Sequence, residues 1–191
     1  MPINRRLARR IGAATATACA AILLPAAALA APARPGSATA PAALPRCTAG
    51  DLTTWVGIPG DGSAGHTTFQ LELSNTTGPT CTIFGFPGVS AFGRGGHKLG
   101  NAAIRNASHR SRVLVLPRGA TAHVELAIAD ISVFPRAACH PARAIGLRVF
   151  APGTTVSHTV PMAFRACAKH GPDYLSVTAA IGGTGVPGFS S

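Results

Sequence analysis

Charged residues are scarce in this chain, and acidic residues are the scarcest. Only 12% of the 191 residues are charged, and Asp and Glu together number 6. That is about half the charged share of an average globular domain. The acids stand singly along the chain, at Asp51, Asp61, Glu72, Glu125, Asp130 and Asp173. A glycosidase pair is therefore not indicated, although Glu72 and Glu125, on the outward faces of expected strands, could meet across a sheet.

The sequence also lacks a C-x-x-C pair and lacks a long apolar run beyond its N-terminus. Cys139-His140 is the only adjacent cysteine and histidine, and the two have the wrong spacing for a zinc site. Seven histidines are present, but none forms a spaced ligand pair, so no metal or cofactor is expected. Ordinary surface histidines are favoured over a pH response. No transmembrane segment is expected in the mature chain.

Residues 1–30 have the three parts of an export signal. Four arginines without an acid precede an apolar stretch, Ile11 to Leu29, and Ala28-Leu29-Ala30 forms a small-x-small site. This pattern predicts a signal peptide that is cleaved after Ala30, and hence a secreted protein. Cys19 is not preceded by the leucine of a lipobox, so a lipoprotein is disfavoured. The arginine pairs leave the choice between the general and the twin-arginine export routes open.

The mature domain is expected to be basic. The full chain carries a formal charge of +11, and removal of the signal leaves 13 Lys and Arg against 6 acids. A net charge of +7 favours attraction to anionic surfaces and implies nothing about the fold.

Four cysteines remain in the mature chain: Cys47, Cys81, Cys139 and Cys167. An even number of cysteines in an exported protein is typical of two disulfides, and four cysteines allow three pairings. The pairing of sequence neighbours, Cys47–Cys81 and Cys139–Cys167, is favoured. Each would close a loop of roughly 30 residues, worth about 3–4 kcal/mol by loop entropy.

The mature chain divides into a tether, a domain and a tail. Residues 31–46 are rich in Ala and Pro without an apolar period, which is typical of a disordered linker. Residues 47–181 form the expected domain, and residues 182–191 a flexible, Gly-rich tail.

Within the domain, apolar residues alternate with polar ones, which predicts strands with one buried face. Turn residues such as Pro117-Arg118-Gly119 separate the segments. Seven or more short strands predict an all-β, Ig-like antiparallel sandwich. The strands are expected at His66–Ser74, Ala120–Ala129, Ala144–Phe150 and Tyr174–Ile181, with shorter ones at Leu52–Val56, Thr80–Phe84 and Arg112–Leu116. One short helical turn is allowed within Phe134–Ala144.

The run Asn75-Thr76, Thr80-Cys81-Thr82-Ile83 and Gly85-Phe86-Pro87-Gly88-Val89, with the later Cys139 and Cys167, resembles an actinobacterial family, domain of unknown function 4232. The resemblance covers residue 47 to about residue 181. It implies a secreted or lipid-anchored Ig-like sandwich with two disulfides, and it assigns no activity and no functional residues. The residues themselves suggest that Asn75 can adopt left-handed backbone and bond to its own chain. They also suggest that Phe86-Pro87-Gly88 crosses between sheets and that Gly119 supplies the positive φ of a type II turn.

The candidate binding surface is the segment Gly93–Arg112, which has no strand period and no acid. Its positive residues, a speculative contact with an anionic surface, are Arg94, Lys98, Arg105, Arg110 and Arg112. Long loops on rigid sandwiches often carry function. The expected partners are anionic cell-envelope polymers, such as cell-wall phosphate polymers. Anionic lipid headgroups of the envelope are a further possibility of the same charge. Nucleic acid is not expected, because the segment has no aromatic residue for base stacking. A solvated loop that binds nothing is the plainer interpretation.

Three functions follow from these features. The first is a non-enzymatic extracellular binding or accessory module, and the second is a purely structural surface protein. The third is a secreted hydrolase, for which Ser63, His66, His123 and Asp130 are the candidates. Ser63 lacks the first glycine of a nucleophile elbow, so no catalytic residue is assigned. Trp55 is expected in the core or an interface rather than as a platform for a sugar.

Overall fold

A computed structural model describes residues 43–63 and 65–184. The predicted signal peptide, residues 31–42 of the predicted linker and residues 185–191 of the predicted tail lie outside the described residues.

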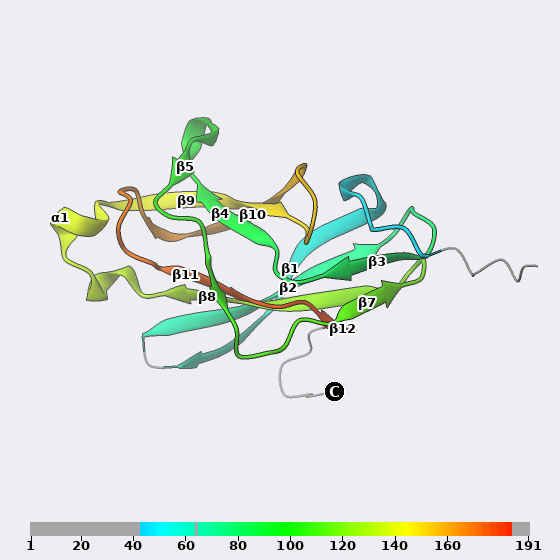
Figure 1. The fold of residues 1–191 in the computed structure, drawn as a ribbon. Coiled ribbons are helices and arrows are strands. Elements are labelled where there is room, and N and C mark those ends of the chain that lie inside the picture. Colours follow the sequence, from blue (N-terminus) through cyan, green and yellow to red (C-terminus); the bar gives the residue numbers. More distant parts are fainter. Residues whose placement is uncertain (1–42, 64, 185–191) are drawn as a thin grey trace, which may run out of the picture. The chain divides into compact units, whose positions relative to one another are not determined.

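Most of the described residues lie in strands, which form two main sheets and a two-stranded ribbon (Figure 1). The large sheet has the order β1-β2-β8-β11-β6, with β12 also paired to β8. Its strands are β1 (Leu52–Ser63), β2 (His66–Asn75), β8 (Thr121–Ala129), β11 (Leu175–Thr178), β6 (Ile104–Asn106) and β12 (Ile181–Gly182). The small sheet consists of β10 (Ser157–Cys167), β9 (Pro141–Phe150), β4 (Gly88–Phe92) and β5 (Lys98–Leu99). The ribbon pairs β3 (Cys81–Phe84) with β7 (Val113–Leu116).

The helical segments are short and lie between strands. They are the 3₁₀ turns η1 (Ala49–Asp51), η2 (Arg94–Gly96) and η3 (Ile131–Val133), and the single α-helical turn α1 (Arg136–Cys139). The position of α1 confirms the helical turn expected within Phe134–Ala144.

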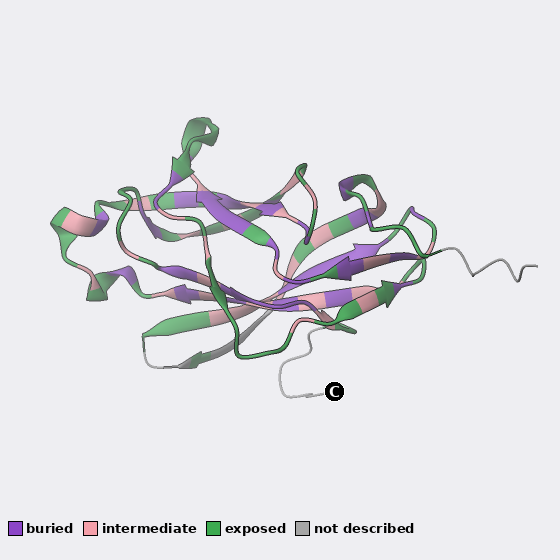
Figure 2. Ribbon diagram, viewed as in Figure 1, coloured by how far each residue is buried: buried purple, intermediate pink, exposed green. Residues whose placement is uncertain are grey.

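The two main sheets form two layers with the core between them (Figure 2). Leu71, Val124 and Leu126 come from the large sheet, while Leu147 and Val149 come from the small sheet, and all five are fully buried. Alternation along β8 is as the sequence predicts, because Val124, Leu126 and Ile128 are buried between half-buried neighbours. The all-β fold with antiparallel sheets is confirmed, apart from β6, which pairs parallel with β11.

Some strands depart from the predicted pattern. β4 and β10 were not predicted, and a register shift between Pro161 and Phe164 breaks the two-residue period of β10. β1 continues to Ser63 through a stretch whose sequence is typical of a turn. Its pairing with β2 contains two register shifts. The single strand expected at Tyr174–Ile181 is divided into β11 and β12.

Both disulfides have the favoured pairing, Cys47–Cys81 and Cys139–Cys167. The first holds the entering chain against β3, where the Cys47 N–H donates to Thr82 O over 2.9 Å and the Thr82 N–H donates to Pro45 O over 2.8 Å. Pro45 therefore belongs to the fold, although the sequence places it in the linker. Similarly, Gly182 of the predicted tail pairs with Ala122 on β8.

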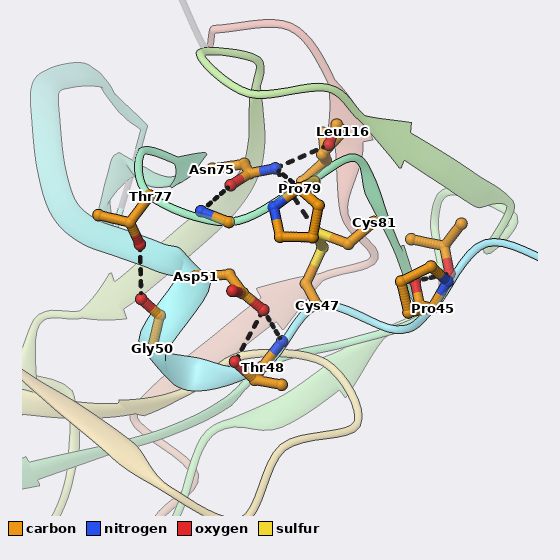
Figure 3. Close-up of a disulfide and its surroundings, with 12 residues drawn as sticks. Pro45, Cys47, Thr48, Gly50, Asp51, Asn75, Thr77, Pro79, Cys81 and Leu116 are labelled. Atoms are coloured by element: carbon orange, nitrogen blue, oxygen red, sulfur yellow. Dashed lines mark hydrogen bonds between the residues drawn. A yellow bond between two sulfur atoms is a disulfide. The ribbon is translucent and has the colours of Figure 1, made fainter.

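Beside the first disulfide, the side chain of Asn75 is completely buried (Figure 3). Its amide nitrogen donates to Pro79 O and Leu116 O, each over 2.9 Å, and its amide oxygen accepts from the Gly78 N–H. The expected bond to its own chain is confirmed. The left-handed backbone is not, because His140 is the only described residue other than glycine with positive φ.

Two further turn predictions are confirmed. Gly119 has φ +86° and stands third in a turn closed by the Ala120 N–H donating to Pro117 O over 2.9 Å, as a type II turn requires. Phe86-Pro87-Gly88 carries the chain from the β3–β7 ribbon into the small sheet.

Candidate functional site

The basic segment Gly93–Arg112 is not the structureless loop that the sequence predicts. It contains η2, β5 and β6, and the stretches between these elements and after β6 lack regular structure. Its first strand pairs with β4 in the small sheet, and its second pairs with β11 in the large sheet. The segment is therefore a strap that runs from one layer of the sandwich to the other (Figure 1).

Because the strap crosses between layers, its five positive residues do not all lie on one sheet. Arg94 and Lys98 are exposed beside the edge of the small sheet. Arg105 is on β6, and its guanidinium lies 5.7 Å from the centre of the Phe86 ring, in the geometry of a cation–π contact. Arg110 and Arg112 follow β6 and lie next to the large sheet. The structure therefore separates the predicted contact surface into two ends.

At the second end, the strap forms one wall of a groove with a volume of about 660 Å³. The wall consists of Ser108, His109, Arg110 and Arg112. The opposite side and the floor come from the large sheet and from β7. They consist of Gln70, Leu114, His123, Glu125, Thr178, Ala180, Ile181 and Gly182.

The floor follows from strand register. Gln70 on β2 lies directly opposite Glu125 on β8, and the Glu125 N–H donates to the Thr178 hydroxyl from β11 over 2.9 Å. A row of polar side chains therefore crosses three neighbouring strands on the face away from the core, as the two-residue period requires. His123, two residues along β8, is held by a hydrogen bond of 2.9 Å between its Nδ1 and Gly183 O.

One polar atom of this floor has no partner in the fold. The side-chain oxygen Oε1 of Gln70 is buried, and no described residue forms a hydrogen bond with it. A buried carbonyl oxygen without a donor is unfavourable, and such atoms are uncommon in native proteins. The Glu125 carboxylate lines the same groove as the two guanidinium-bearing residues of the strap. The groove can therefore offer an acceptor to hydroxyl groups and donors to an anion.

The two candidate glycosidase residues lie on the same face of the large sheet, but only one of them lines the groove. Glu72 pairs with His123 across β2 and β8, so Glu125 is its diagonal neighbour, at about 7–8 Å in sheet geometry. Glu72 is only 4% exposed and does not line the groove, whereas Glu125 does. The expectation that Glu72 is an exposed strand charge is wrong, because Trp55 and His123 flank it on the two neighbouring strands.

Three of the four hydrolase candidates lie at one end of the large sheet, where Ser63 pairs with His66 in the β1–β2 hairpin and His66 pairs with Ala129, the neighbour of Asp130. His123 lies apart. His66 and Asp130 line a pocket of about 580 Å³ beside the β1–β2 hairpin. His123 lies seven residues from Asp130 along the β8 direction, which is roughly 20 Å or more at the rise of a strand. The carboxylate of Asp130 accepts from the Ser132 N–H over 2.9 Å, and this bond lowers the pKa of Asp130. The side chain of Ser63 lies outside the described residues.

The sequence favours a position for Trp55 in the core or an interface. Trp55 is 39% exposed on β1, so it is not in the core. Among the described residues, no helix is long and apolar enough to cross a membrane, and no three His, Cys, Asp or Glu side chains gather as a metal site.

Comparison with known proteins places the chain in a family. Neither a curated protein nor a solved structure matches it. A family profile described as a domain of unknown function (DUF4232) matches residues 47–180, which is more than half of the chain and nearly the whole described fold. The match confirms the resemblance carried by the Asn75–Val89 motifs and the later cysteines. The chain belongs to the DUF4232 family of domains of unknown function.

Proposed function

We propose that the protein is a secreted, non-enzymatic binding module of the cell envelope, and that the groove beneath the strap takes a segment of an anionic, hydroxyl-bearing polymer. The observation that carries the proposal is the position of Arg110 and Arg112 on one wall of the groove, across from Gln70 and Glu125. Guanidinium groups bind phosphate and carboxylate in a planar, two-point geometry. The Glu125 carboxylate on the floor suits the hydroxyl groups of a sugar or polyol.

Export is supported by the features of residues 1–30 and by the two disulfides, because disulfides persist in oxidising compartments. The net charge of the mature chain supports attraction to an anionic envelope, since charge of one sign raises the local concentration of the opposite sign. Among anionic polymers, a cell-wall phosphate polymer fits better than a nucleic acid. The groove lining has no Phe, Tyr or Trp among the described residues on which a base could stack.

The test is retention on isolated cell walls at increasing salt. Replacing both groove arginines, Arg110→Gln with Arg112→Gln, should abolish the salt-sensitive part of retention. The matched control is Arg94→Gln with Lys98→Gln, which removes the same charge from the other end of the strap and should leave most of the retention intact. Equal losses in both variants would show that net charge alone is responsible. No salt-sensitive retention of the native chain would favour a purely structural surface protein.

A further inference from the structure

A second cluster of positive charge lies on the small sheet, away from the strap. The hairpin formed by β9 and β10, from Pro141 to Cys167, contains three arginines and no acid. Two of them, Arg143 on β9 and Arg165 on β10, are directly opposite each other in the antiparallel register. Both side chains are exposed. Like charges in directly opposed positions destabilise a strand pair, and an anion bound between them would relieve that repulsion.

The surroundings of the two arginines leave room for an anion. Arg143 and Arg165 both line a pocket of about 540 Å³, together with Pro141, Ala142, Ala163 and Phe164. Opposed side chains on neighbouring strands have Cβ atoms about 4.5–5.5 Å apart, so both guanidinium groups can reach one tetrahedral anion. Arg165 also borders the pocket that contains Asp130. The pKa of Asp130 is lowered mainly by its bonds to Ser132 and, to a lesser extent, by the charge of Arg165, so this acid compensates part of the charge of the pair.

The backbone that carries the pair is fixed. Cys167 pairs with Pro141 two positions from the arginines, and its disulfide to Cys139 closes the base of the hairpin. Ala144 and Ala166, which flank the pair, are fully buried and hold both strands in the core. A site that is ordered before binding loses less entropy when the ligand arrives.

We propose that Arg143 and Arg165 form a binding site for a phosphate group, separate from the groove beneath the strap. The ligand is a phosphate dianion, either free or as a monoester, held by two parallel guanidinium contacts. The site shares no residue with the groove and does not depend on the proposed function. Loss of retention in the Arg110 and Arg112 variant would leave phosphate binding at the hairpin unchanged.

The test is calorimetric titration of the full chain with inorganic phosphate against chloride at equal ionic strength, with glycerol phosphate in a parallel arm. Saturable binding of either phosphate supports the site, and the stronger of the two identifies the free ion or the monoester as the ligand. Arg143→Gln and Arg165→Gln should each weaken binding about tenfold. The control Arg118→Gln removes an equal charge from the turn between β7 and β8 and should change the affinity less than about twofold. No saturable binding, or an equal loss in the control, would overturn the proposal.

A charge reversal tests independently whether the side chains at positions 143 and 165 lie close together. Arg143→Glu places opposite charges across the two strands, and so should raise the melting temperature without phosphate while abolishing phosphate binding. Because both positions are exposed, these variants should fold as the native chain does. Phosphate affinity that survives Arg143→Glu, or a melting temperature that does not rise, would contradict the close approach of the two side chains.

Discussion

Asn75 joins three parts of the fold through one buried amide. It is the last residue of β2, bonds to the loop before β3 through Pro79 O and Gly78 N–H, and reaches Leu116 at the end of β7. Both N–H groups of the amide donate and its oxygen accepts, while the side chain is completely buried. An amide side chain at this point can form hydrogen bonds with backbone groups that water cannot reach, whereas an apolar side chain of similar size cannot.

We therefore expect Asn75→Ala to lower the free energy of unfolding by roughly 3 kcal/mol, because two carbonyl oxygens and one N–H would lose their partner. Urea denaturation measures the loss. Thr77→Ala is the control. It removes an exposed hydrogen bond of 2.8 Å to Gly50 O in the same region and should cost about 1 kcal/mol or less. Similar losses in the two variants would show that the buried amide has no special role.

At the scale of elements, the fold is held at its entrance by a short cap. The carboxylate of Asp51 accepts from the hydroxyl and the N–H of Thr48, each over 2.7 Å, and closes the capping box of η1. The side-chain bond, followed by the backbone bond, lowers the pKa of Asp51 below its usual value of 3.8. The pKa of Asp130, which caps η3 through Ser132, is lowered for the same kind of reason.

These shifts predict how stability depends on acid. A carboxylate whose pKa is lower in the folded state stabilises the fold above the unfolded pKa, and this contribution is lost as the pH falls through the folded pKa. Stability should therefore fall as the pH drops below about 4. Asp51→Asn should flatten that slope, and Asp51→Asn with Asp130→Asn should flatten it further. Urea midpoints between pH 2 and pH 6 measure the effect, and an unchanged slope in Asp51→Asn would show that the cap is not formed in solution.

At the scale of the whole molecule, the two disulfides staple different parts of the sandwich. Cys47–Cys81 ties the entering chain to the β3–β7 ribbon, and Cys139–Cys167 ties α1 to the end of β10. The linked cysteines are 34 and 28 residues apart in sequence. Since the two links close separate loops, their effects on the unfolded chain should be largely independent.

Removing either link should lower the free energy of unfolding by about 3–4 kcal/mol by loop entropy. The variants are Cys47→Ala with Cys81→Ala, and Cys139→Ala with Cys167→Ala, compared by chemical denaturation. Reductant should shift the midpoint of the native chain and leave a variant without both links unaffected. Free thiols at all four positions in the purified native protein would contradict the two disulfides and would count against the proposed export.

How much of this could be predicted from sequence depends on whether the signal is local. The period of β8 and the turn at Gly119 are local, because they depend on which neighbours are apolar and which position needs positive φ. β10 could not be predicted, since its register shift and Pro161 break the period within the strand. The burial of Glu72 also could not be predicted, because Trp55 and His123, which flank it, lie on other strands.

The candidate site also has features that depend on local sequence and features that depend on long-range strand pairing. Residue types alone determined that the chain is basic, that its cysteines pair and that the Gly93–Arg112 segment concentrates positive charge. Only the tertiary structure decided which of those charges act together, because the partners of β5 and β6 are far away in sequence and belong to different sheets. The groove and the Arg143–Arg165 pair exist through strand register. Register is set by long-range pairing, which no stretch of sequence contains by itself.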